Sequence, residues 1–383
     1  MRIVHLSDTH LGAAAFNVLD PRTGRNLREQ DFYEAFQRVV EAVCKTKPDL
    51  VLHAGDLFDA VRPPNRAITE AIEGFRRILD ADIPLAVAAG NHETPRLRST
   101  GNIFRALQAA LPRACLAFDG ECRRLEAGGA VVHAVGDAPT EEELQKALES
   151  VRPEKGKTNI LVLHAGLTRL EDRVTSGEYN QHAVPRDRLS NLGRDFDYLA
   201  LGHYHRPLKV DGIDSAWYSG ATERTSIEAA SITPGYLEIE LPPLRVRQVP
   251  IEGRAMIDFP PLPCEGLSAR EVMDRLRDTL EGKIQGAIVR VILDGLEPAV
   301  AAELPPAEIA ALRRPALDCQ IEFRLRRPGR RPGGEPLAFQ SLPLEFERFL
   351  DAYAPGEKFE RAPVKALGLK YLGEVLQEGA GTP

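Results

Sequence analysis

The 383-residue sequence has few cysteines, no long apolar run and no excess of basic residues, and each absence excludes a class of protein. Five scattered cysteines without a CxxC pair exclude a disulfide framework or a zinc ribbon and indicate reduced, buried thiols in a cytoplasmic protein. No stretch approaches the ~20 apolar residues that a membrane-spanning helix needs. The N-terminal MRIVHLSDTH does not resemble a signal peptide. Because 49 basic and 56 acidic residues leave a net charge of −7, binding of nucleic acid by bulk positive charge is also excluded.

Short apolar segments alternate with amphipathic segments over residues 1–252, which predicts one α/β domain. Strands are expected at Arg2–Ser7, Leu50–Ala54, Leu85–Ala89, Ala130–Val135, Ile160–His164 and Tyr198–Leu201. Helices are expected at Gln30–Lys45, Asn65–Leu79 and Asn102–Leu111. The alternation favours parallel strands at first, whereas Trp217–Ser219 and Gly235–Gln248 look antiparallel. The predicted fold class is therefore α/β, a two-sheet α/β sandwich with helices outside.

A change in composition near residue 253 predicts a small α+β domain over residues 253–326. Phe259–Pro263 (FPPLP) is interpreted as a stiff linker, because proline fixes φ and removes a hydrogen-bond donor. A helix with Ser268 as its N-cap is expected next. The expected helices and strands are Ser268–Glu281, Ala287–Leu293, Pro305–Leu312 and Cys319–Leu325.

The remaining sequence predicts a linker and a helical tail. Residues 327–341 are rich in Pro, Gly and Arg, and residues 342–383 contain two amphipathic helices. The apolar residues on one face of each helix are Leu342, Phe346, Phe349, Leu350 and Tyr353 in the first, and Val364, Leu367, Tyr371, Leu372 and Val375 in the second. So short a tail cannot form its own core, so it either folds back on the body or docks on a partner protein.

Polar side chains follow the ends of three successive predicted strands. Asp8 and His10 lie two apart and so point to the same side of an extended chain. Asp56 follows the second strand in GDLFD, and Asn91 and His92 follow the third in GNHE. Taken alone, the pair of Asp8 and His10 favours a simple strand-end turn in which Asp8 caps the following backbone. Because ligands bind outside the carboxyl ends of strands in open α/β sheets, we expect these residues to converge.

Three further histidines repeat this pattern. His164 ends an apolar strand, and His203 and His205 in GHYH follow another. The alternative is a set of structural histidines that reach strand ends by coincidence. Seven candidate ligands exceed the need of one ion and suit two divalent ions, with Mn²⁺, Fe²⁺ or Zn²⁺ favoured by mixed oxygen and imidazole donors. The candidate ligands are Asp8, His10, Asp56, Asn91, His164, His203 and His205.

The ordered motifs D-x-H, GD, GNHE, a lone His and GHxH resemble the calcineurin-like metallophosphoesterase superfamily over about residues 1–220. The resemblance implies that Asp8, His10, Asp56 and His205 hold one metal ion. It implies that Asp56, Asn91, His164 and His203 hold the other, with Asp56 as the bridge. His92 would be the catalytic residue, which stabilises the charge of the scissile phosphate and protonates the leaving oxygen.

Within the superfamily, HLSDTHLG, the loop and helix after GDLFD, and the small domain plus helical tail resemble the SbcD-type (meiotic recombination eleven) DNA double-strand-break-repair nucleases. This implies a nuclease with two ions, most often Mn²⁺, that cuts duplex ends as an exonuclease and single strands as an endonuclease. It implies a nucleoid-associated homodimer, formed through Asn65–Leu79 and Asn102–Leu111, whose small domain caps DNA. The tail would bind an SMC-like ABC ATPase of the SbcC type. A phosphate-contacting role for Asp59 is left open.

Local clusters of arginine are the candidate DNA contacts in this acidic chain. Each of them is equally compatible with ordinary solvated surface charge. The candidates are Arg22, Arg25 and Arg28 in the loop after the first motif, Arg96 and Arg98 after GNHE, and Arg186, Arg188 and Arg194 before GHYH. Two rival functions remain, namely a metallophosphatase acting on a small-molecule or protein phosphoester, and a non-catalytic scaffold for the ATPase. The scaffold is disfavoured because every ligand position is filled.

Overall fold

The structure is a computed structural model that describes residues 1–168, 182–326, 341–352 and 361–378. Two compact units make up the chain, Met1–Arg326 and Arg327–Pro383. The predicted linker, residues 327–341, lies outside the described residues except for its last position. Nothing in the structure tests the finer division at residue 252, which stays a prediction.

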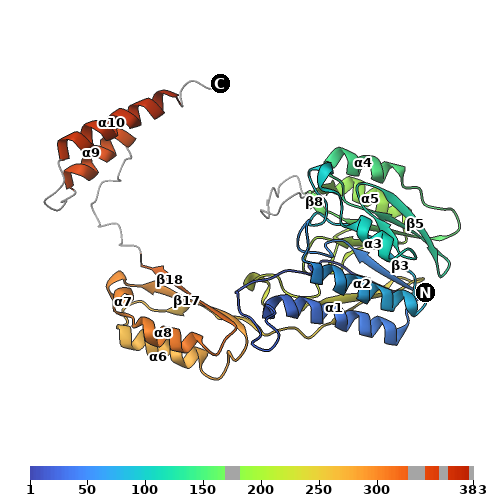
Figure 1. The fold of residues 1–383 in the computed structure, drawn as a ribbon, viewed down its shortest axis with the longest axis horizontal. Helices are drawn as coiled ribbons and strands as arrows, with labels where there is room; N and C mark the ends of the chain where they lie inside the picture. The colour runs from blue at the N-terminus through green and yellow to red at the C-terminus, as the bar shows by residue number, and fades with distance from the viewer. Residues whose placement is uncertain (169–181, 327–340, 353–360, 379–383) are drawn as a thin grey trace. The chain divides into compact units, whose positions relative to one another are not determined.

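Residues 1–250, called the large module below, contain two six-stranded sheets (Figure 1). The first sheet has the order β14 (Arg245–Pro250), β13 (Gly235–Glu240), β1 (Arg2–Leu6), β2 (Leu50–Ala54), β3 (Leu85–Ala88) and β4 (Cys115–Ala117). Strands β1 to β4 are parallel, and β13 and β14 continue the sheet antiparallel. The parallel strands are therefore the ones whose carboxyl ends share an edge.

The second sheet has a parallel centre and antiparallel edges. Its order is β11 (Leu208–Lys209), β12 (Ala216–Tyr218), β10 (Tyr198–Gly202), β7 (Thr158–His164), β6 (Ala130–Val135) and β5 (Cys122–Ala127). Strands β12, β10, β7 and β6 are parallel, while β11 and β5 run antiparallel to their neighbours. A two-stranded parallel sheet, β8 (Gly166–Thr168) and β9 (Ala183–Pro185), follows β7.

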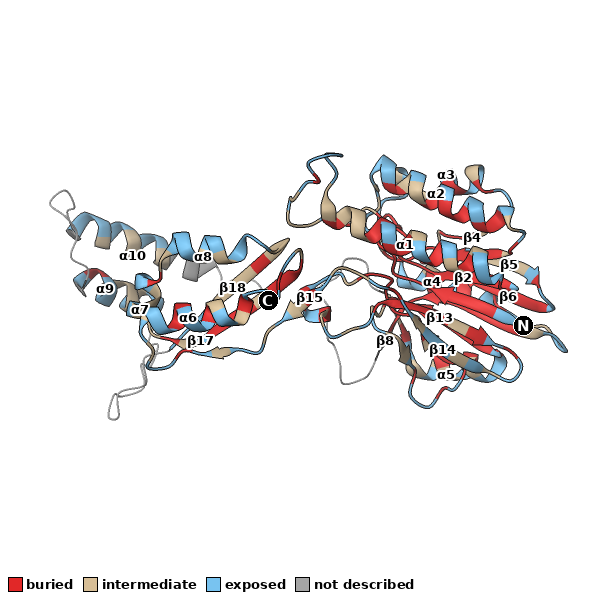
Figure 2. Ribbon diagram, turned by 90° about the horizontal axis from the view of Figure 1, so that it is seen from below, coloured by how far each residue is buried: buried red, intermediate tan, exposed pale blue. Residues whose placement is uncertain are grey.

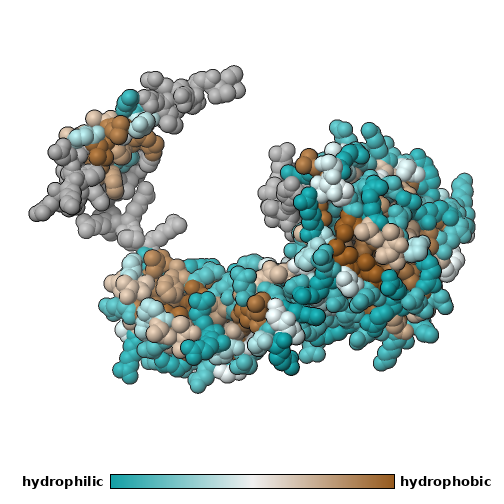
Figure 3. All heavy atoms as spheres, in the orientation of Figure 1, coloured by the Kyte–Doolittle hydropathy of each residue, from teal (hydrophilic) through white to brown (hydrophobic). Residues whose placement is uncertain are grey.

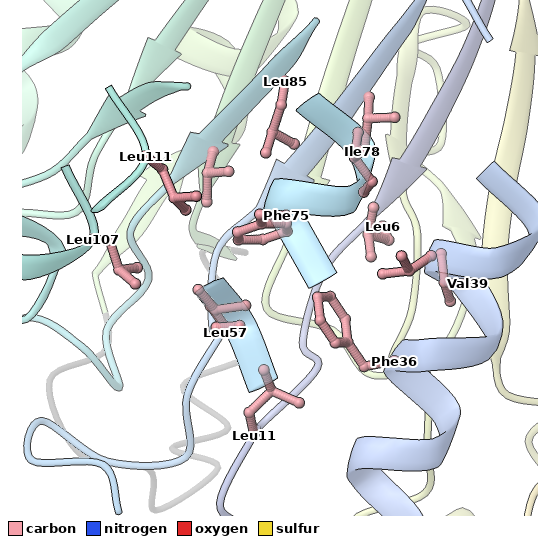
Figure 4. Close-up of a cluster of buried hydrophobic side chains, with 14 of the residues drawn as sticks. Leu6, Leu11, Phe36, Val39, Leu57, Phe75, Ile78, Leu85, Leu107 and Leu111 are labelled. Carbon is pink, nitrogen blue, oxygen red and sulfur yellow. The ribbon is translucent and has the colours of Figure 1, made fainter. Parts of the chain in front are cut away.

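Helices cover the outer face of each sheet, which confirms the predicted sandwich. On the first sheet lie α1 (Leu27–Thr46), α2 (Asn65–Asp80) and α3 (Phe104–Ala110), and a buried apolar cluster joins them to it (Figure 4). On the second lie α4 (Glu141–Ser150) and α5 (Arg186–Asp195). A third cluster, including Ile3, Leu52 and Ile160, fills the space between the sheets.

Helix α1 illustrates how the sequence specifies these elements. Asn26 caps it, because its side-chain oxygen accepts hydrogen bonds from the N–H groups of Arg28 (2.9 Å) and Glu29 (3.1 Å). Phe36, Val39 and other buried residues recur three or four positions apart and meet α2 and the sheet (Figure 4). One amphipathic face therefore orients the helix that follows the first candidate ligands.

Residues 256–325, called the small module below, form a separate parallel sheet with its own apolar cluster. Its elements are β15 (Met256–Asp258), β16 (Leu262–Pro263), α6 (Ala269–Leu280), β17 (Ile288–Leu296), α7 (Pro298–Glu303), α8 (Pro306–Arg313) and β18 (Asp318–Leu325). Strand β17 lies at the centre and pairs with β15, β16 and β18. Ser268 caps α6 in a complete capping box with Glu271, as predicted for the N-cap.

The expectation that Phe259–Pro263 is a linker was wrong. Its last two residues form β16, and Phe259 N–H donates to Arg290 O (3.0 Å), so the segment belongs to the edge of the small sheet. Proline is compatible with such a strand because it has no N–H to donate, and a residue at the edge of a sheet does not need to donate to a second neighbouring strand.

Two further expectations need correction. Helices α4 and α5 were not predicted, because both are strongly polar and bury few residues, such as Leu144 and Leu189. Trp217–Ser219 was expected to be antiparallel, yet β12 is parallel to β10 and antiparallel only to β11. The pattern of side chains reports burial and does not report the direction of the neighbouring strand.

The second unit contains a helical hairpin of α9 (Leu342–Ala352) and α10 (Arg361–Glu378). Phe346 packs directly on Gly368, and Leu350 is buried. Leu342 and Phe349 were predicted on the same face as Phe346 and Leu350. Both side chains are instead exposed. Tyr353 lies outside the described residues.

Candidate metal centre

The predicted ligands meet where β1, β2 and β3 end. Backbone hydrogen bonds align the first two loops, with Asp8 N–H donating to Gly55 O (2.9 Å) and His10 N–H donating to Asp56 O (3.1 Å). On the neighbouring sheet His164 ends β7 and His203 follows β10, and these two strands are parallel partners. The carboxyl edges of both sheets therefore supply the same site, as the strand-end rule predicts.

Asp8, His10 and His205 form the first group of candidate ligand atoms, each within 4.8 Å of the others. The Nε2 atoms of His10 and His205 lie 3.1 Å apart, and His205 Nε2 lies 4.0 Å from Asp8 Oδ1. Two imidazole nitrogens and a carboxylate thus face one point, which is the arrangement a divalent ion requires.

Asp8, Asp56 and His164 form a second group. His164 Nε2 lies 3.2 Å from Asp56 Oδ2 and 3.0 Å from Asn91 Oδ1, so Asn91 belongs to the same cluster. The second histidine nitrogen is engaged, because His164 Nδ1 lies 2.8 Å from Ala54 O and can donate to it. In this structure the two groups share Asp8, and bridging by Asp56 stays a prediction.

His203 is held against both groups. Its backbone N–H donates to the two carboxylate oxygens of Asp8 (3.1 and 3.2 Å), and its ring lies edge-on to His164 with centroids 5.4 Å apart. All seven predicted ligands are thereby brought together, and six of them are buried while His205 is partly exposed.

The backbone adopts left-handed conformations at four of these positions, with φ of 51° at Asp8, 43° at His10, 52° at Asp56 and 115° at His203. Such conformations are costly for residues other than glycine and tend to occur at functional sites. Gly90 makes room for the cluster, since a Cβ there would overlap the Asp56 carboxylate. The site therefore depends on local strain as well as on its side chains.

The electrostatics of the site favour a bound cation. Burial disfavours imidazolium, yet the nearby carboxylates, with Asp59 first for His10 and Asp56 first for His164, raise the pKa of His10 to about 9 and that of His164 to about 10. The buried carboxylates thus demand positive charge. Oxygen and imidazole donors without thiolate fit one or two divalent ions.

His92 lies at the rim of the centre and is partly exposed. Its backbone N–H donates to Asp56 Oδ1 (3.1 Å), and its Nδ1 lies 2.9 Å from Asp59 O. Its Nε2 is 3.9 Å from Asp56 Oδ2, and its ring centroid is 4.8 Å from that of His10. The imidazole is therefore positioned beside the ligands without belonging to either group described above.

Asp59 joins His10 and His92 in a third group of candidate ligand atoms. Its Oδ1 lies 3.4 Å from His10 Nδ1, although the side chain is 43 % exposed. The sequence motifs did not mark Asp59 as a ligand, and its position directly after GDLF was the available signal.

Glu93 organises the site and was not recognised from the sequence. Its buried carboxylate accepts hydrogen bonds from the N–H groups of Phe58 (2.6 Å) and Gly90 (2.7 Å), and so ties the second loop to the third. Burial, reinforced by the charge of Asp56, raises its pKa to about 7. Its place in GNHE next to His92 was the signal that could have suggested a structural role.

The predicted DNA-contacting arginines differ in their surroundings. The side chain of Arg28 is only 3 % exposed and lies 3.0 Å from Asp31 and 3.4 Å from Glu223, so it is a buried structural residue and that expectation was wrong. Arg22, Arg25 and Arg96 are exposed, and Arg98 is exposed and paired with Glu143. Arg186, Arg188 and Arg194 all lie on α5.

Comparison with known proteins now supplies the family. The sequence pattern of the calcineurin-like phosphoesterases matches residues 1–207, which is more than half of the chain. The chain belongs to this family. The resemblance inferred from the motifs is thereby confirmed, and residues 1–207 of the large module match the family.

Curated relatives carry the description "DNA double-strand break repair protein Mre11". The protein of Sulfurisphaera tokodaii is 31% identical over 215 residues, covering 55% of this chain and 51% of its own length. That of Haloferax volcanii is 29% identical over 304 residues, covering 77% of this chain and 61% of its own length. The chain thus spans about half to three fifths of the length of these relatives.

Among the described residues, none of the helices combines the length and the apolar character that a membrane-spanning segment needs.

Proposed function

We propose that this metallophosphoesterase is a DNA nuclease that processes double-strand breaks, acting as an exonuclease on duplex ends and as an endonuclease on single strands. The observation that carries the proposal is the pair of ligand groups that share buried Asp8 where the carboxyl edges of the two sheets meet, with His92 beside them. The relatives described as break-repair proteins support DNA as the substrate.

The residues would divide the work as the motifs imply. Asp8, His10 and His205 would hold one ion, and Asp56, Asn91, His164 and His203 the other, with Asp56 also reaching the first. Two ions, for which we propose Mn²⁺, would supply Lewis acidity and an activated water when bound.

His92 would act on the substrate directly. With Nδ1–H donating to Asp59 O, its ring is fixed and Nε2 lies 3.9 Å from Oδ2 of the buried Asp56. From there a protonated Nε2 would stabilise negative charge on the scissile phosphate and donate its proton to the leaving oxygen.

DNA contacts would be local. Arg22, Arg25, Arg96 and Arg98 are the exposed candidates, whereas Arg28 is excluded by its burial. Reversing the charge of Arg22 and Arg25 should weaken DNA binding and flatten its dependence on salt, because fewer counterions are released. Unaltered affinity would remove this loop from the proposed footprint.

The helical hairpin is the proposed docking site for an SMC-like ABC ATPase of the SbcC type. Its exposed apolar residues are Leu342, Leu344, Phe349, Val364, Leu367 and Tyr371, and Figure 3 shows apolar side chains gathered over these helices. Deletion of residues 342–383 should abolish co-purification with the ATPase. Retained co-purification would contradict this assignment.

A homodimer is proposed through α2 and α3. Three isoleucines pack against the core yet are only partly buried, namely Ile68 and Ile72 on α2 and Ile103 directly before α3. Light scattering of wild type against Ile72→Glu tests it, since a charge in the interface should yield monomers.

The decisive experiment incubates end-labelled duplex DNA with Mn²⁺ and compares wild type with His92→Asn. Shortened products from the wild type alone support the proposal. Absence of cleavage together with hydrolysis of small phosphoesters would instead support a metallophosphatase.

A further inference from the structure

Residues 221–230, called the linking segment below, run from the metal centre to the small module. At the start, Ala221 N–H donates to His205 O (3.0 Å), and Ala221 bridges to Ser7 next to Asp8. The segment ends in a short 3₁₀ turn, Ile227–Ala229. It therefore contacts the loops that carry Asp8 and His205 before it reaches the sheet of the small module.

At the metal centre the linking segment contacts His205 itself. Thr225 Oγ1 lies 2.9 Å from His205 Nδ1, on the side of the ring opposite the Nε2 atom that faces Asp8 and His10. A hydrogen bond from Nδ1–H to this hydroxyl selects the tautomer whose Nε2 carries a lone pair. Such outer contacts fix the orientation and basicity of a metal-binding histidine.

At its other end the linking segment packs on the small module. Ile227 shares a buried apolar cluster with Met256 of β15 and Ile288 of β17. Next to it, Glu228 Oε1 lies 2.7 Å from Arg290 Nη1. A shift of the small module would therefore pull on residues two and three positions from Thr225.

A charge cluster, called the clamp below, holds this arrangement. Arg254 donates two hydrogen bonds to Asp31 of α1 (2.6 and 2.7 Å) and one to Gly286 O of the small module (2.8 Å). Arg224 Nη1 of the linking segment donates to Arg254 O (3.3 Å). Bidentate guanidinium–carboxylate pairs combine strength with a fixed geometry, so this pair suits a joint between elements.

Arg28 completes the clamp. Its Nη1 donates to Asp31 (3.0 Å), and its Nη2 donates to Arg224 O and lies 3.4 Å from Glu223. Arg28 and Glu223 are buried, and the side chains of Asp31 and Arg254 are only 10% and 21% exposed, so the Arg28 and Arg254 pairs with Asp31 are partly shielded from solvent. The residue expected to contact DNA thus ties α1 to the linking segment.

We propose that Thr225 is a positioning residue for His205, and that the clamp and the linking segment couple the placement of the small module to binding of the ion held by Asp8, His10 and His205. The proposal rests on the two-ion site and not on the identity of the substrate. Any force that displaces the small module would thereby loosen one ion and leave the ion at His164 in place.

Titration of the full chain with Mn²⁺, followed by calorimetry and electron paramagnetic resonance, tests the role of Thr225. Thr225→Val keeps the shape and removes the hydroxyl, and we expect about 10- to 100-fold weaker binding of one ion. Thr225→Ser should restore the wild-type affinity. Wild-type binding of both ions by Thr225→Val would overturn the proposal.

Arg254→Gln tests the coupling. It should weaken the same ion, and the double variant with Thr225→Val should lose little more than the stronger single variant, because both act on one ligand. Arg247→Gln on β14, which breaks a surface pair with Glu238 of β13, is the matched control and should bind both ions normally. Unchanged ion affinity in Arg254→Gln, or simple additivity, would refute the coupling.

Folding is checked by circular dichroism, and Asp31→Asn breaks the same pair from the other side should Arg254→Gln fail to fold. Wild type that binds two ions without cutting DNA would defeat the proposed nuclease function and leave this inference intact. DNA cleavage by wild type, with normal ion binding by both Thr225→Val and Arg254→Gln, would do the reverse.

Discussion

Both the large and the small module have buried strands, drawn red in Figure 2, but the two modules bury different kinds of side chain. The large module buries carboxylates and imidazoles at one edge, among them Asp8, Asp56 and His164. In the described residues of the small module no polar or charged residue is buried. Since burying a charge is costly without a counter-charge or a metal ion, the contrast separates a chemical site from a structural scaffold.

The largest effect should come from Asp56→Asn, which removes a buried negative charge from the ligands yet keeps a side chain that tolerates φ of 52°. We expect loss of high-affinity Mn²⁺ binding and of activity, measured by calorimetry and phosphoester hydrolysis. Asp82→Asn is the matched control, because Asp82 also has a left-handed φ, 58°, but its side chain is 91% exposed. Normal ion binding by Asp56→Asn would contradict the assignment.

His92→Asn should lower kcat by about 10²- to 10⁴-fold, the usual contribution of a general acid. Because His92 lies outside the ligand groups that share Asp8, both ions should still bind. Single-turnover kinetics and Mn²⁺ titration measure the two quantities. Loss of ion binding in parallel with activity would make His92 a ligand instead.

Leu276→Ala should affect the stability of the small module and leave the metal centre unchanged. Leu276 is fully buried in the core of the small module, so its truncation should lower the free energy of unfolding of that module by about 2–5 kcal/mol. Urea unfolding measures this change. Ion binding should be normal wherever the module remains folded.

The control is Leu325→Ala on β18, where the side chain is 49% exposed and the cost should stay within about 0.5 kcal/mol. Equal effects at both positions would show that the small module lacks a cooperative core.

The smallest effect should come from Ser268→Ala, which removes the capping hydroxyl of α6. The expected cost is about 0.5–2 kcal/mol of the same unfolding free energy, without any change in kcat. Ser268→Asp should retain most of the stability, since aspartate also caps helices. A loss of activity in Ser268→Ala would contradict a purely structural role.

The metal centre was predictable because strand ends follow from local patterns and parallel strands place their ends together. Asp8, Asp56 and His164 each follow an apolar run, so convergence required no knowledge of side-chain packing. The nearest supports were not predictable. Thr225 meets His205 across twenty positions of chain, in a contact that no spacing rule specifies.

Arg28 shows a second limit. In the sequence it ends a loop with Arg22 and Arg25, which indicates surface charge, whereas its burial depends on Asp31 and on the distant Glu223. The same holds for Phe259–Pro263, where prolines suggest an isolated linker until β17 is present to pair with it. Local composition indicates which structures a segment can adopt, and the contacts with residues distant in sequence decide which of them it adopts.

The left-handed backbone conformations in the metal centre favour ion binding but lower folding stability. They occur at Asp8, His10, Asp56 and His203. Each such conformation costs a residue other than glycine about 1–3 kcal/mol. Glycine at these positions would relieve that strain and abolish ion binding, so selection for thermal endurance alone would erode the centre. The centre thus persists through selection for its chemistry, at a standing expense in folding stability.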